Sequence, residues 1–600
     1  MAVDWSTEWY TSLLWILGVS VAAALATALV GALLVRSTTW GRQFRRLAFP
    51  YFSPRGPEGW RPLIAALAVL VLTITGVRVQ VINSYNINGL YTALQNLDPA
   101  AFGRSVVFFA ILSVVALAHV LLSYYVEQRL IIRFRVWLND RVVGDWLDGR
   151  AYHRGRYTAS AVDNPDQRIQ EDVGSFASTS MTLITGAISS MVSLVSFSLI
   201  LWQLSGPLTV FGTEIPRAMV FVAYLYVIVA TVFAFRIGRP LIGLSFRNEQ
   251  FNASYRYALV RVRESSEAIA FQRGEDVERR TLGGRFGSVI DNAWAIVFRS
   301  LKFQGFNLVV TQFSQIIPLV IQAPRYFAGG ISLGDVQQTA SAFGQVESAL
   351  SFFRLAYDDF ATYRATLIRL TGLLDADAEA RALPAVTLEN GDGLQVRDLT
   401  VRLPDDRVLV DDLDLNLSAG DALLVAGASG SGKTTLLRSF ADLWPWAEGT
   451  VRRPLDGEAL FLSQQPYVPL GSLWTGLAYP GDAAGVDDAR AADVLRRVQL
   501  PHLVDRLDDE VDWARRLSPG EQQRLGFARV LLTRPRVVFL DEATSALDEG
   551  LEHTLYTMLR EELPDTVVVS VGHRSTLNQF HAERLELLGD GRWQVAALQR

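Results

Sequence analysis

The chain has 600 residues, of which 50% are hydrophobic and 20% charged, and its mean hydropathy is +0.21. These values are high for a soluble protein of this size and predict that part of the chain lies in a membrane. The net charge of -5 gives no support for a basic nucleic-acid-binding face. The absence of cysteine excludes disulfides and Cys-ligated zinc, and six scattered histidines do not suggest a metal centre.

The first apolar run, residues 13–35, is long enough to cross a bilayer. A signal peptide is the alternative, but Asp4 and Glu8 precede the run, and the run is too long for one. The arginines that follow predict a cytoplasmic position after this span, with the N-terminus outside: Arg36, Arg42, Arg45, Arg46, Arg55 and Arg61.

Further apolar runs bring the prediction to seven spans: roughly 63–82, 105–126, 180–204, 217–238, 303–323 and 333–356. The connections 127–179 and 239–302 are rich in arginine, whereas 83–104 and 205–216 are poor in Lys and Arg. This alternation predicts that the C-terminal half lies in the cytoplasm. Apolar residues at helical spacing in the basic connections predict long helices that extend beyond the membrane, with soluble loops as the alternative.

Polar residues recur at helical spacing on three of the later spans. Such side chains face protein or water, because an unsatisfied polar group in hydrocarbon is costly. The pattern predicts a water-filled cavity for a polar solute, and the alternative is polar bridges between packed helices. The residues are Thr185, Ser189, Ser193 and Ser196, then Thr311, Gln315 and Gln322, then Gln337, Ser341, Gln345 and Ser348.

A P-loop motif follows the apolar run 422–426 and precedes a helical pattern. Its glycines let backbone N–H groups surround phosphate oxygens, its lysine can reach the β and γ phosphates, and its first threonine can ligate Mg²⁺. The alternative is a glycine-rich turn without a ligand. The predicted nucleotide-binding residues are Gly427, Ala428, Ser429, Gly430, Ser431, Gly432, Lys433, Thr434 and Thr435.

Two adjacent acids end a later apolar strand, residues 537–541. Asp541 is predicted to hold Mg²⁺ through water, and Glu542 to orient and polarise the water that attacks the γ-phosphate. A surface turn is the alternative for such a pair when it stands alone.

Residues 517–524, Leu-Ser-Pro-Gly-Glu-Gln-Gln-Arg, resemble the signature sequence of ATP-binding-cassette (ABC) ATPases. The resemblance implies that Ser518 and Gly520, together with Glu521, bind the nucleotide held by the opposite subunit. Pro519 stands where that family usually has glycine, and Glu521 stands where glutamine is common.

The rest of the cassette is also recognisable. Gln464 matches the Q-loop and is thereby implied to contact both the nucleotide and the metal; residues 545–548 match the D-loop, and His573 matches the switch histidine that contacts the γ-phosphate. The aromatic residue that usually stacks on adenine is missing, because Leu403 occupies its position. This departure leaves the selectivity for the base open.

Several membrane segments resemble the SbmA/BacA-like family, which is of the peroxisomal and YddA-like half-transporter type. The likeness is strongest to the mycobacterial BacA-like group, which implies an exporter-shaped fold used to import cobalamin, bleomycin-like compounds or antimicrobial peptides. The resembling segments are 146–152, 163–169, 238–241, 246–249 and 264–275.

The predicted fold is therefore an α-helical transmembrane domain of exporter-type ABC fold with about seven spans and long intracellular helices, followed by an α/β P-loop ATPase domain. The expected parts are an extra N-terminal helix with its cytoplasmic connection (1–62), the membrane domain (63–374), a polar linker (375–393) and the nucleotide-binding domain (394–600). The cytoplasmic tips of the long helix pairs, near Asp172 and near 271–275, are predicted to transmit motion of the nucleotide-binding domain to the membrane domain.

The predicted function is ATP-driven import of hydrophilic solutes across a bacterial inner (plasma) membrane, with ATP and Mg²⁺ as cofactors and Glu542 and His573 as catalytic residues. A single P-loop and a single signature predict a homodimer, because each ATP site needs both. Two alternatives are an ATP-driven exporter of lipids or drugs, and a proton-coupled carrier with a regulatory cassette that uses acids such as Glu249, Glu264 and Glu347. A third alternative is a receptor that uses ATP as a switch, but the sequence shows no additional ligand or output domain for such a role.

Overall fold

The computed structural model describes residues 5–598 apart from 57, 159–161, 163, 211–212, 456 and 482–486. Asp4 and Asp163, which contributed to the predictions above, thus lie outside the described residues. The chain divides into two compact units: Met1–Asp145 with Asp163–Leu374, and Trp146–Val162 with Asp375–Arg600.

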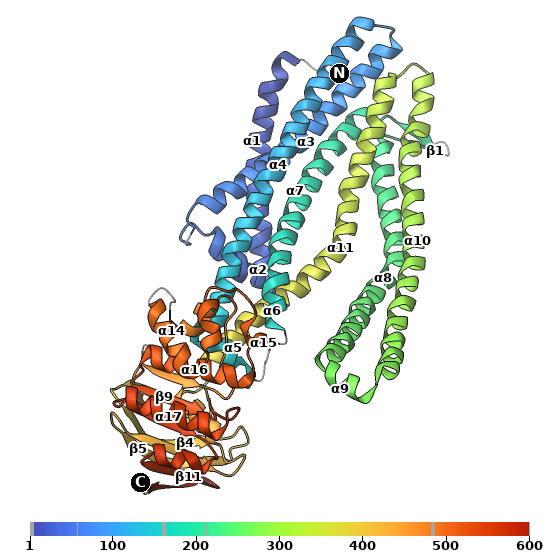
Figure 1. Ribbon diagram of the computed structural model, residues 1–600. Coiled ribbons are helices and arrows are strands. Elements are labelled where there is room, and N and C mark those ends of the chain that lie inside the picture. The colour runs from blue at the N-terminus through green and yellow to red at the C-terminus, as the bar shows by residue number, and fades with distance from the viewer. Residues whose placement is uncertain are drawn as a thin grey trace. The chain divides into compact units, whose positions relative to one another are not determined.

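The first unit is built from long helices (Figure 1). Among the residues that the structure describes, six helices are long and apolar enough to cross a membrane, and they begin at Thr7, Arg61, Pro99, Pro165, Ala218 and Glu275. The helices are α1 (Trp5–Ser37), α2 (Thr39–Phe52), α3 (Arg61–Gln95), α4 (Pro99–Leu147), α6 (Pro165–Gln167), α7 (Val173–Leu204), α8 (Ala218–Glu264), α9 (Ser266–Gln272), α10 (Glu275–Phe327) and α11 (Leu333–Ala382).

The predicted helical membrane domain is confirmed, and six of the seven predicted spans fall on these apolar helices. The seventh, 333–356, falls on α11, which is helical but carries the polar residues noted above and is not among the six. The 49 residues of α4 would extend about 74 Å, more than twice a hydrocarbon core of about 30 Å. The predicted long helices are therefore present.

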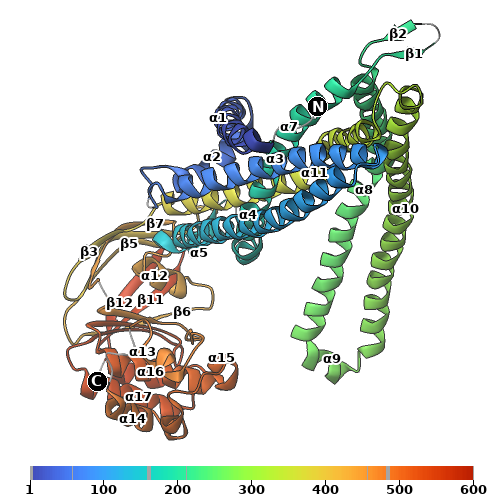
Figure 2. The same ribbon diagram turned by 90° about the horizontal axis from the view of Figure 1, so that it is seen from above.

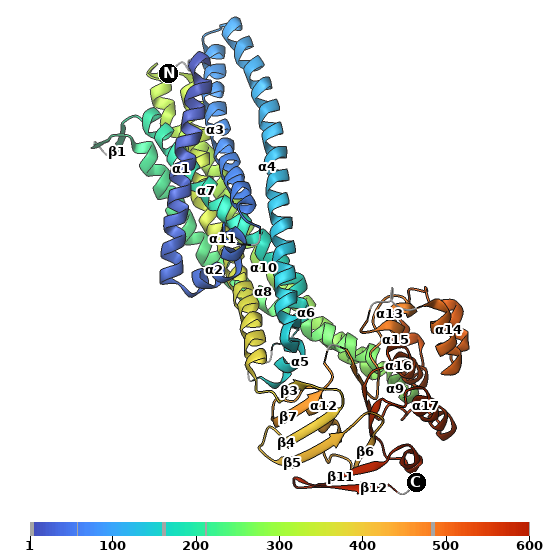
Figure 3. The same ribbon diagram turned by 90° about the vertical axis from the view of Figure 1, so that its left-hand side faces the viewer.

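Helices α8 and α10 pack side by side and are joined through α9 (Figures 1 and 2). Helix α3 packs against α7, and α1 packs against α2 and α3 of the same chain (Figure 3). The contact of α1 with α3 includes an ion pair between Glu8 and Arg78, and Arg78 also donates to Ser12 at 3.0 Å. The first span therefore packs on its own subunit.

Some residues of the predicted polar stripes form bridges between helices. Gln322 is buried and donates to the hydroxyl of Thr339 at 3.2 Å, and Arg325 donates to the carbonyl of Leu204 at 3.1 Å. Thr311 and Gln315 are instead exposed on α10. The bridging alternative therefore holds for Gln322, and the cavity stays a prediction.

The predicted tip residue Asp172 is held inside the first unit. It lies in a π-helical turn, Arg168–Asp172, just before α7. Arg369 of α11 donates to both of its carboxylate oxygens, at 2.7 and 2.6 Å, and the Asp172 carboxylate is almost fully buried. Asp172 thus fixes α7 to α11 in this unit.

The second unit contains two sheets (Figure 3). The larger has the order β12-β11-β6-β10-β9-β8, with parallel pairing from β11 to β8 and β12 antiparallel at the edge. The strands are β6 (Ala422–Gly427), β8 (Ala459–Leu462), β9 (Val537–Asp541), β10 (Val567–Val571), β11 (Glu583–Gly589) and β12 (Arg592–Ala597).

The smaller sheet has the order β3-β7-β4-β5, formed by β3 (Thr387–Asn390), β4 (Leu394–Arg402), β5 (Val408–Leu417) and β7 (Ala447–Arg453). Helices α12 (Lys433–Phe440), α13 (Leu473–Ala478), α14 (Asp488–Arg497), α15 (Trp513–Arg516), α16 (Pro519–Thr533) and α17 (Glu549–Glu562) complete the unit. Strands β6, β9 and β10 are nearly fully buried, so their apolar runs form the core. The predicted α/β domain is confirmed.

The boundaries of this unit differ from the predicted domain boundaries in two places. Residues 146–162, placed in the membrane domain from sequence, pack in the second unit and include helix α5 (Ala151–Arg154). The predicted linker, 375–393, is partly structured, because α11 continues to Ala382 and β3 follows. Alanine and charged residues that favour helix in 375–382 account for the continuation.

Candidate functional site

The P-loop connects β6 to α12, as the sequence predicts. Gly427, Gly430 and Gly432 have φ values of 146°, 79° and 99°. A side chain would be strained in these conformations, and a Cβ on Gly427 would lie 2.8 Å from the carbonyl oxygen of Leu587. The loop thus needs glycine to turn sharply and to bring α12 against the end of β6.

Lys433 is the first residue of α12 and is largely buried. Its ammonium donates to the carbonyls of Gly427 and Ala428 at 3.0 and 2.9 Å. Burial lowers the pKa of Lys433, while Glu542 and Asp541 act in the opposite direction. The lysine charge therefore lies inside the curve of the P-loop, where it can meet phosphate oxygens.

Asp541 ends β9, which pairs with β10, and β10 in turn pairs with β6, the strand that leads into the P-loop. The hydroxyl of Thr434 donates to its carboxylate at 3.2 Å. Burial raises the pKa of Asp541, and the hydrogen bond from Thr434 lowers it. A hydroxyl and a carboxylate at this spacing are hard oxygen ligands of the kind that Mg²⁺ prefers.

Glu542 follows directly and has a left-handed backbone, with φ of 49°. Its N–H donates to the carbonyl of Val571 in β10 at 3.1 Å, which fixes the turn. The Glu542 carboxylate lies 3.2 Å from Nε2 of His573. The structure thus brings the two predicted catalytic residues together, at the ends of adjacent strands.

Ser518 caps α16. Its hydroxyl accepts from the N–H of Glu521 at 3.3 Å, and the Glu521 carboxylate accepts from the Ser518 N–H at 2.9 Å, so the two form a capping box. The other Glu521 oxygen lies 2.9 Å from Nε2 of His502. Burial raises the pKa of Glu521, but the hydrogen bonds from Ser518 outweigh it, and the pKa falls below its usual value. Nucleotide binding by Glu521 stays a prediction, because its carboxylate serves the cap.

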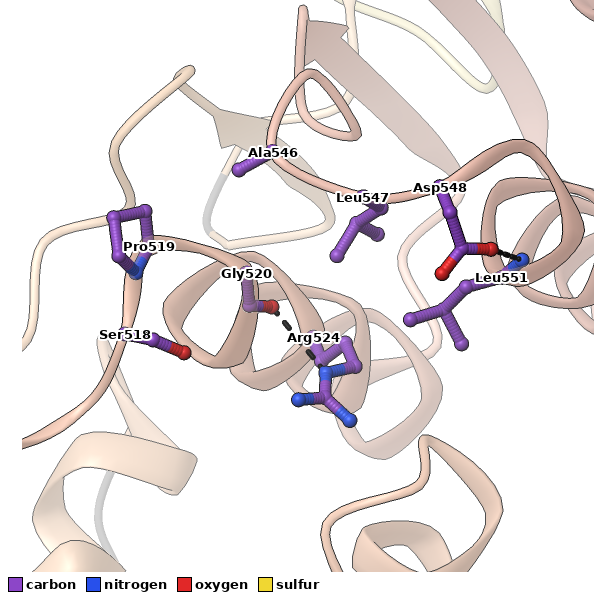
Figure 4. A pocket seen from close by; sticks show the side chains of 8 residues that line it. All are labelled: Ser518, Pro519, Gly520, Arg524, Ala546, Leu547, Asp548 and Leu551. Atoms are coloured by element: carbon purple, nitrogen blue, oxygen red, sulfur yellow. Dashed lines mark hydrogen bonds between the residues drawn. The ribbon is translucent and has the colours of Figure 1, made fainter.

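A hollow of about 440 Å³ lies beside this cap (Figure 4). The start of α16 forms one wall and the segment before α17 forms the other. A Cβ on Gly520 would lie 3.2 Å from the carbonyl oxygen of Ala546, so only glycine fits here without a shift. The lining residues are Ser518, Pro519, Gly520, Arg524, Ala546, Leu547, Asp548 and Leu551, and none belongs to the P-loop.

Gln523 is a residue whose importance the sequence motifs did not reveal. It is buried on α16 and donates to the carbonyl of Gln464 at 2.9 Å and to Ser545 at 3.1 Å, while it accepts from the N–H of Ala546 at 2.9 Å. It therefore joins the Q-loop and the D-loop to the signature helix. A polar residue on the buried side of an amphipathic helix was the available signal.

Two other predicted positions are described by the structure. Gln464 is exposed after β8, and only its carbonyl has a described hydrogen bond, so its nucleotide and metal contacts stay predictions. Leu403 is partly buried and packs against the core around β4 and β7. No described group of three or more His, Cys, Asp and Glu residues could hold a metal ion by itself. A Mg²⁺ ion at Thr434 and Asp541 would thus share its coordination with the nucleotide and water.

Two known protein families match this chain. Residues 48–327 match the family described as ABC transporter transmembrane region 2, and residues 410–545 match the family described as ABC transporter. An uncharacterized ABC transporter ATP-binding protein of Haemophilus influenzae is 45% identical over 99% of this chain and all of its own length.

Two further relatives carry more specific names. The inner membrane ABC transporter ATP-binding protein YddA of Escherichia coli is 31% identical over 85% of this chain and 91% of its own. The human lysosomal cobalamin transporter ABCD4 is 30% identical over 84% of this chain and 88% of its own. ATP and Mg²⁺ binding and ATP hydrolysis coupled to transport are features of this family, and the predicted resemblance is confirmed at that level. The chain therefore belongs to the ABC transporter family and is related to its ABCD-type and YddA-type half-transporters.

Proposed function

We propose that the chain works as a homodimer that uses ATP to import hydrophilic solutes. The observation that carries the dimer is the separation of the two halves of the ATP site. The hollow at Ser518 and Gly520 has no P-loop residue in its lining. A second copy that offers its P-loop to this hollow would complete two equivalent sites.

Each residue of the site then has a distinct task. Lys433 and the P-loop amides bind the phosphates, and Thr434 and Asp541 hold Mg²⁺, which neutralises charge on the phosphates. Glu542 positions the attacking water and accepts its proton, and His573 holds the Glu542 carboxylate in place. Ser518 and Gly520 of the partner subunit close the site and sense whether the γ-phosphate is present.

The relatives and the polar residues of the membrane helices support the proposed solute class and the proposed direction of transport. The human relative is named a cobalamin transporter, and the sequence motifs resemble those of SbmA/BacA-like importers. Gln337, Ser341 and Gln345 are half-buried on α11, where a large hydrophilic solute could reach them. We place the protein in a bacterial inner membrane with the cassette in the cytoplasm, as the arginine-rich connections indicate.

The test is ATP-dependent flux of labelled cobalamin in proteoliposomes whose cassettes face outward. Import toward the cytoplasm predicts that preloaded cobalamin leaves the lumen when ATP is added outside, and that Glu542→Gln abolishes this loss. Accumulation in the lumen would mean export and would refute the proposed direction. Flux that persists in Glu542→Gln and stops when the proton gradient collapses would favour a proton-coupled carrier.

A further inference from the structure

A basic hollow lies on the first unit, away from the ATP site. It encloses about 730 Å³, within the range of about 300–1,000 Å³ that is common for small-molecule sites. Five of its six lining residues come from α2 and one from α4: Arg42, Arg45, Arg46, Phe49, Pro50 and Arg141. No acidic residue that the structure describes is in this lining.

The four α2 residues Arg42, Arg45, Arg46 and Phe49 are spaced so that they share one helix face, and all four are exposed. The opposite face is buried through Leu47, Ala48 and Tyr51. Helix α2 is thus amphipathic in an unusual sense, because its exposed face is both basic and aromatic. Such a face fits the interface of an anionic membrane.

The α4 wall of the hollow is held rigid. Arg141 donates to the backbone carbonyl of Arg46 at 3.2 Å, and its guanidinium lies 5.6 Å from the ring centre of Trp137. Trp137 in turn packs against Tyr51 of α2, with ring centres 5.3 Å apart. The arginines therefore stand on two helices that are fixed to each other.

The chain positions this hollow at the end of two candidate spans. The first ends at Ser37, two residues before α2, and the next begins at Arg61, nine residues after α2. Helix α2 packs on both α1 and α3. A basic face between two candidate spans is expected at the depth of lipid headgroups, where Phe49 beside it would enter the acyl boundary.

We propose that this hollow binds the headgroup of an acidic phospholipid from the leaflet in which α1 ends. Guanidinium groups bind phosphate oxygens through paired hydrogen bonds, and basic pockets beside membrane helices select anionic headgroups. One lipid at this site would bridge α2 and α4. It is independent of the transported solute and of the direction of transport.

The test uses the detergent-solubilised full chain and native mass spectrometry with dioctanoyl-phosphatidylglycerol. We expect one tightly bound lipid per chain, with dioctanoyl-phosphatidylcholine binding clearly more weakly. Arg42→Gln with Arg45→Gln should weaken phosphatidylglycerol binding about tenfold or more, because each basic side chain near a membrane surface contributes on the order of 1 kcal/mol, about a fivefold change in affinity. Arg279→Gln with Arg280→Gln, two exposed arginines near the start of α10, is the matched control and should bind as the unaltered chain does.

Other outcomes would overturn the proposal. Equal binding of the two lipids by the unaltered chain would exclude a headgroup site, and this comparison needs no variant. Displacement of the lipid by an equal concentration of inorganic phosphate would indicate a site for a free anion. A shift from dimer to monomer in Arg42→Gln with Arg45→Gln would mean that the face is an interface between copies.

Discussion

Replacement of Arg154 by alanine is expected to separate ATP hydrolysis from transport. Arg154 lies in residues 146–162, which continue from α4 along the chain yet pack in the second unit. Its buried guanidinium donates to the carbonyls of Leu383 and Pro384 at 2.6 and 2.8 Å and lies 4.0 Å from Asp442. Tyr157 adds edge-to-face contacts with Trp444 and Trp446, so this segment is anchored at several points.

The two hydrogen bonds set the size of the effect. A hydrogen bond to a charged group contributes about 1.5–3 kcal/mol, so losing both costs about 3 kcal/mol or more and lowers the equilibrium constant for docking of the segment by about two orders of magnitude. Transport per ATP hydrolysed should fall sharply in Arg154→Ala, while hydrolysis itself continues. Arg156→Ala, an exposed arginine of the same segment, is the control and should keep the normal ratio. An unchanged ratio in folded Arg154→Ala protein would refute the reasoning.

Three further predictions concern catalysis and stability. Glu542→Gln should keep ATP binding and lose about 10²–10⁴-fold in phosphate release, since a positioned general base contributes that much; a normal rate would exclude Glu542 as the base. Asp172→Asn should lower the midpoint of thermal unfolding by weakening the bonds from Arg369, an effect of about 1–2 kcal/mol given the partly exposed arginine, and an unchanged midpoint would contradict the role of this pair. Burial lowers the pKa of His581 to about 4 from its ordinary 6.5. Between these pH values the unfolded chain binds a proton at His581 that the folded chain does not bind. The free energy of unfolding should therefore fall by up to about 3 kcal/mol as the pH drops from 6.5 to 4. His581→Gln should flatten this dependence in unfolding measured across that range, because glutamine can still bond Ser570 but does not titrate.

The positions of the nucleotide-site motifs on strands and helices could be predicted closely, because each motif is a short contiguous stretch. The P-loop at 427–435 needs glycines at fixed spacing, and Asp541 and Glu542 must end a buried strand. Pairing of β9 with β10 then brings Glu542 to His573, a contact that neither the motifs nor their spacing revealed. Gln523 escaped prediction because its role depends on two loops that meet its helix only in the folded unit.

The membrane unit was predictable in outline only. The length of an apolar run indicates a span, but it does not show which polar residue bridges two helices. Gln322 and Thr311 belong to the same predicted polar stripe, yet Gln322 is buried and Thr311 is exposed. The anchoring of residues 146–162 was likewise missed, because it depends on carbonyl groups that any sequence could offer. Asp172 was assigned to a moving tip, and its pairing with Arg369 could not be inferred because Arg369 lies far along the chain.

The central claim, that each ATP site needs two copies of the chain, is tested most directly with a mixed dimer. One copy carries Lys433→Ala and the other Gly520→Asp, each with a different tag, and tandem purification isolates the mixed species. Either variant alone should be inactive as a homodimer, whereas the mixed dimer keeps one site with an intact P-loop and an intact signature and should hydrolyse ATP. A mixed dimer as inactive as its parents, with all proteins folded and dimeric, would contradict the composite site.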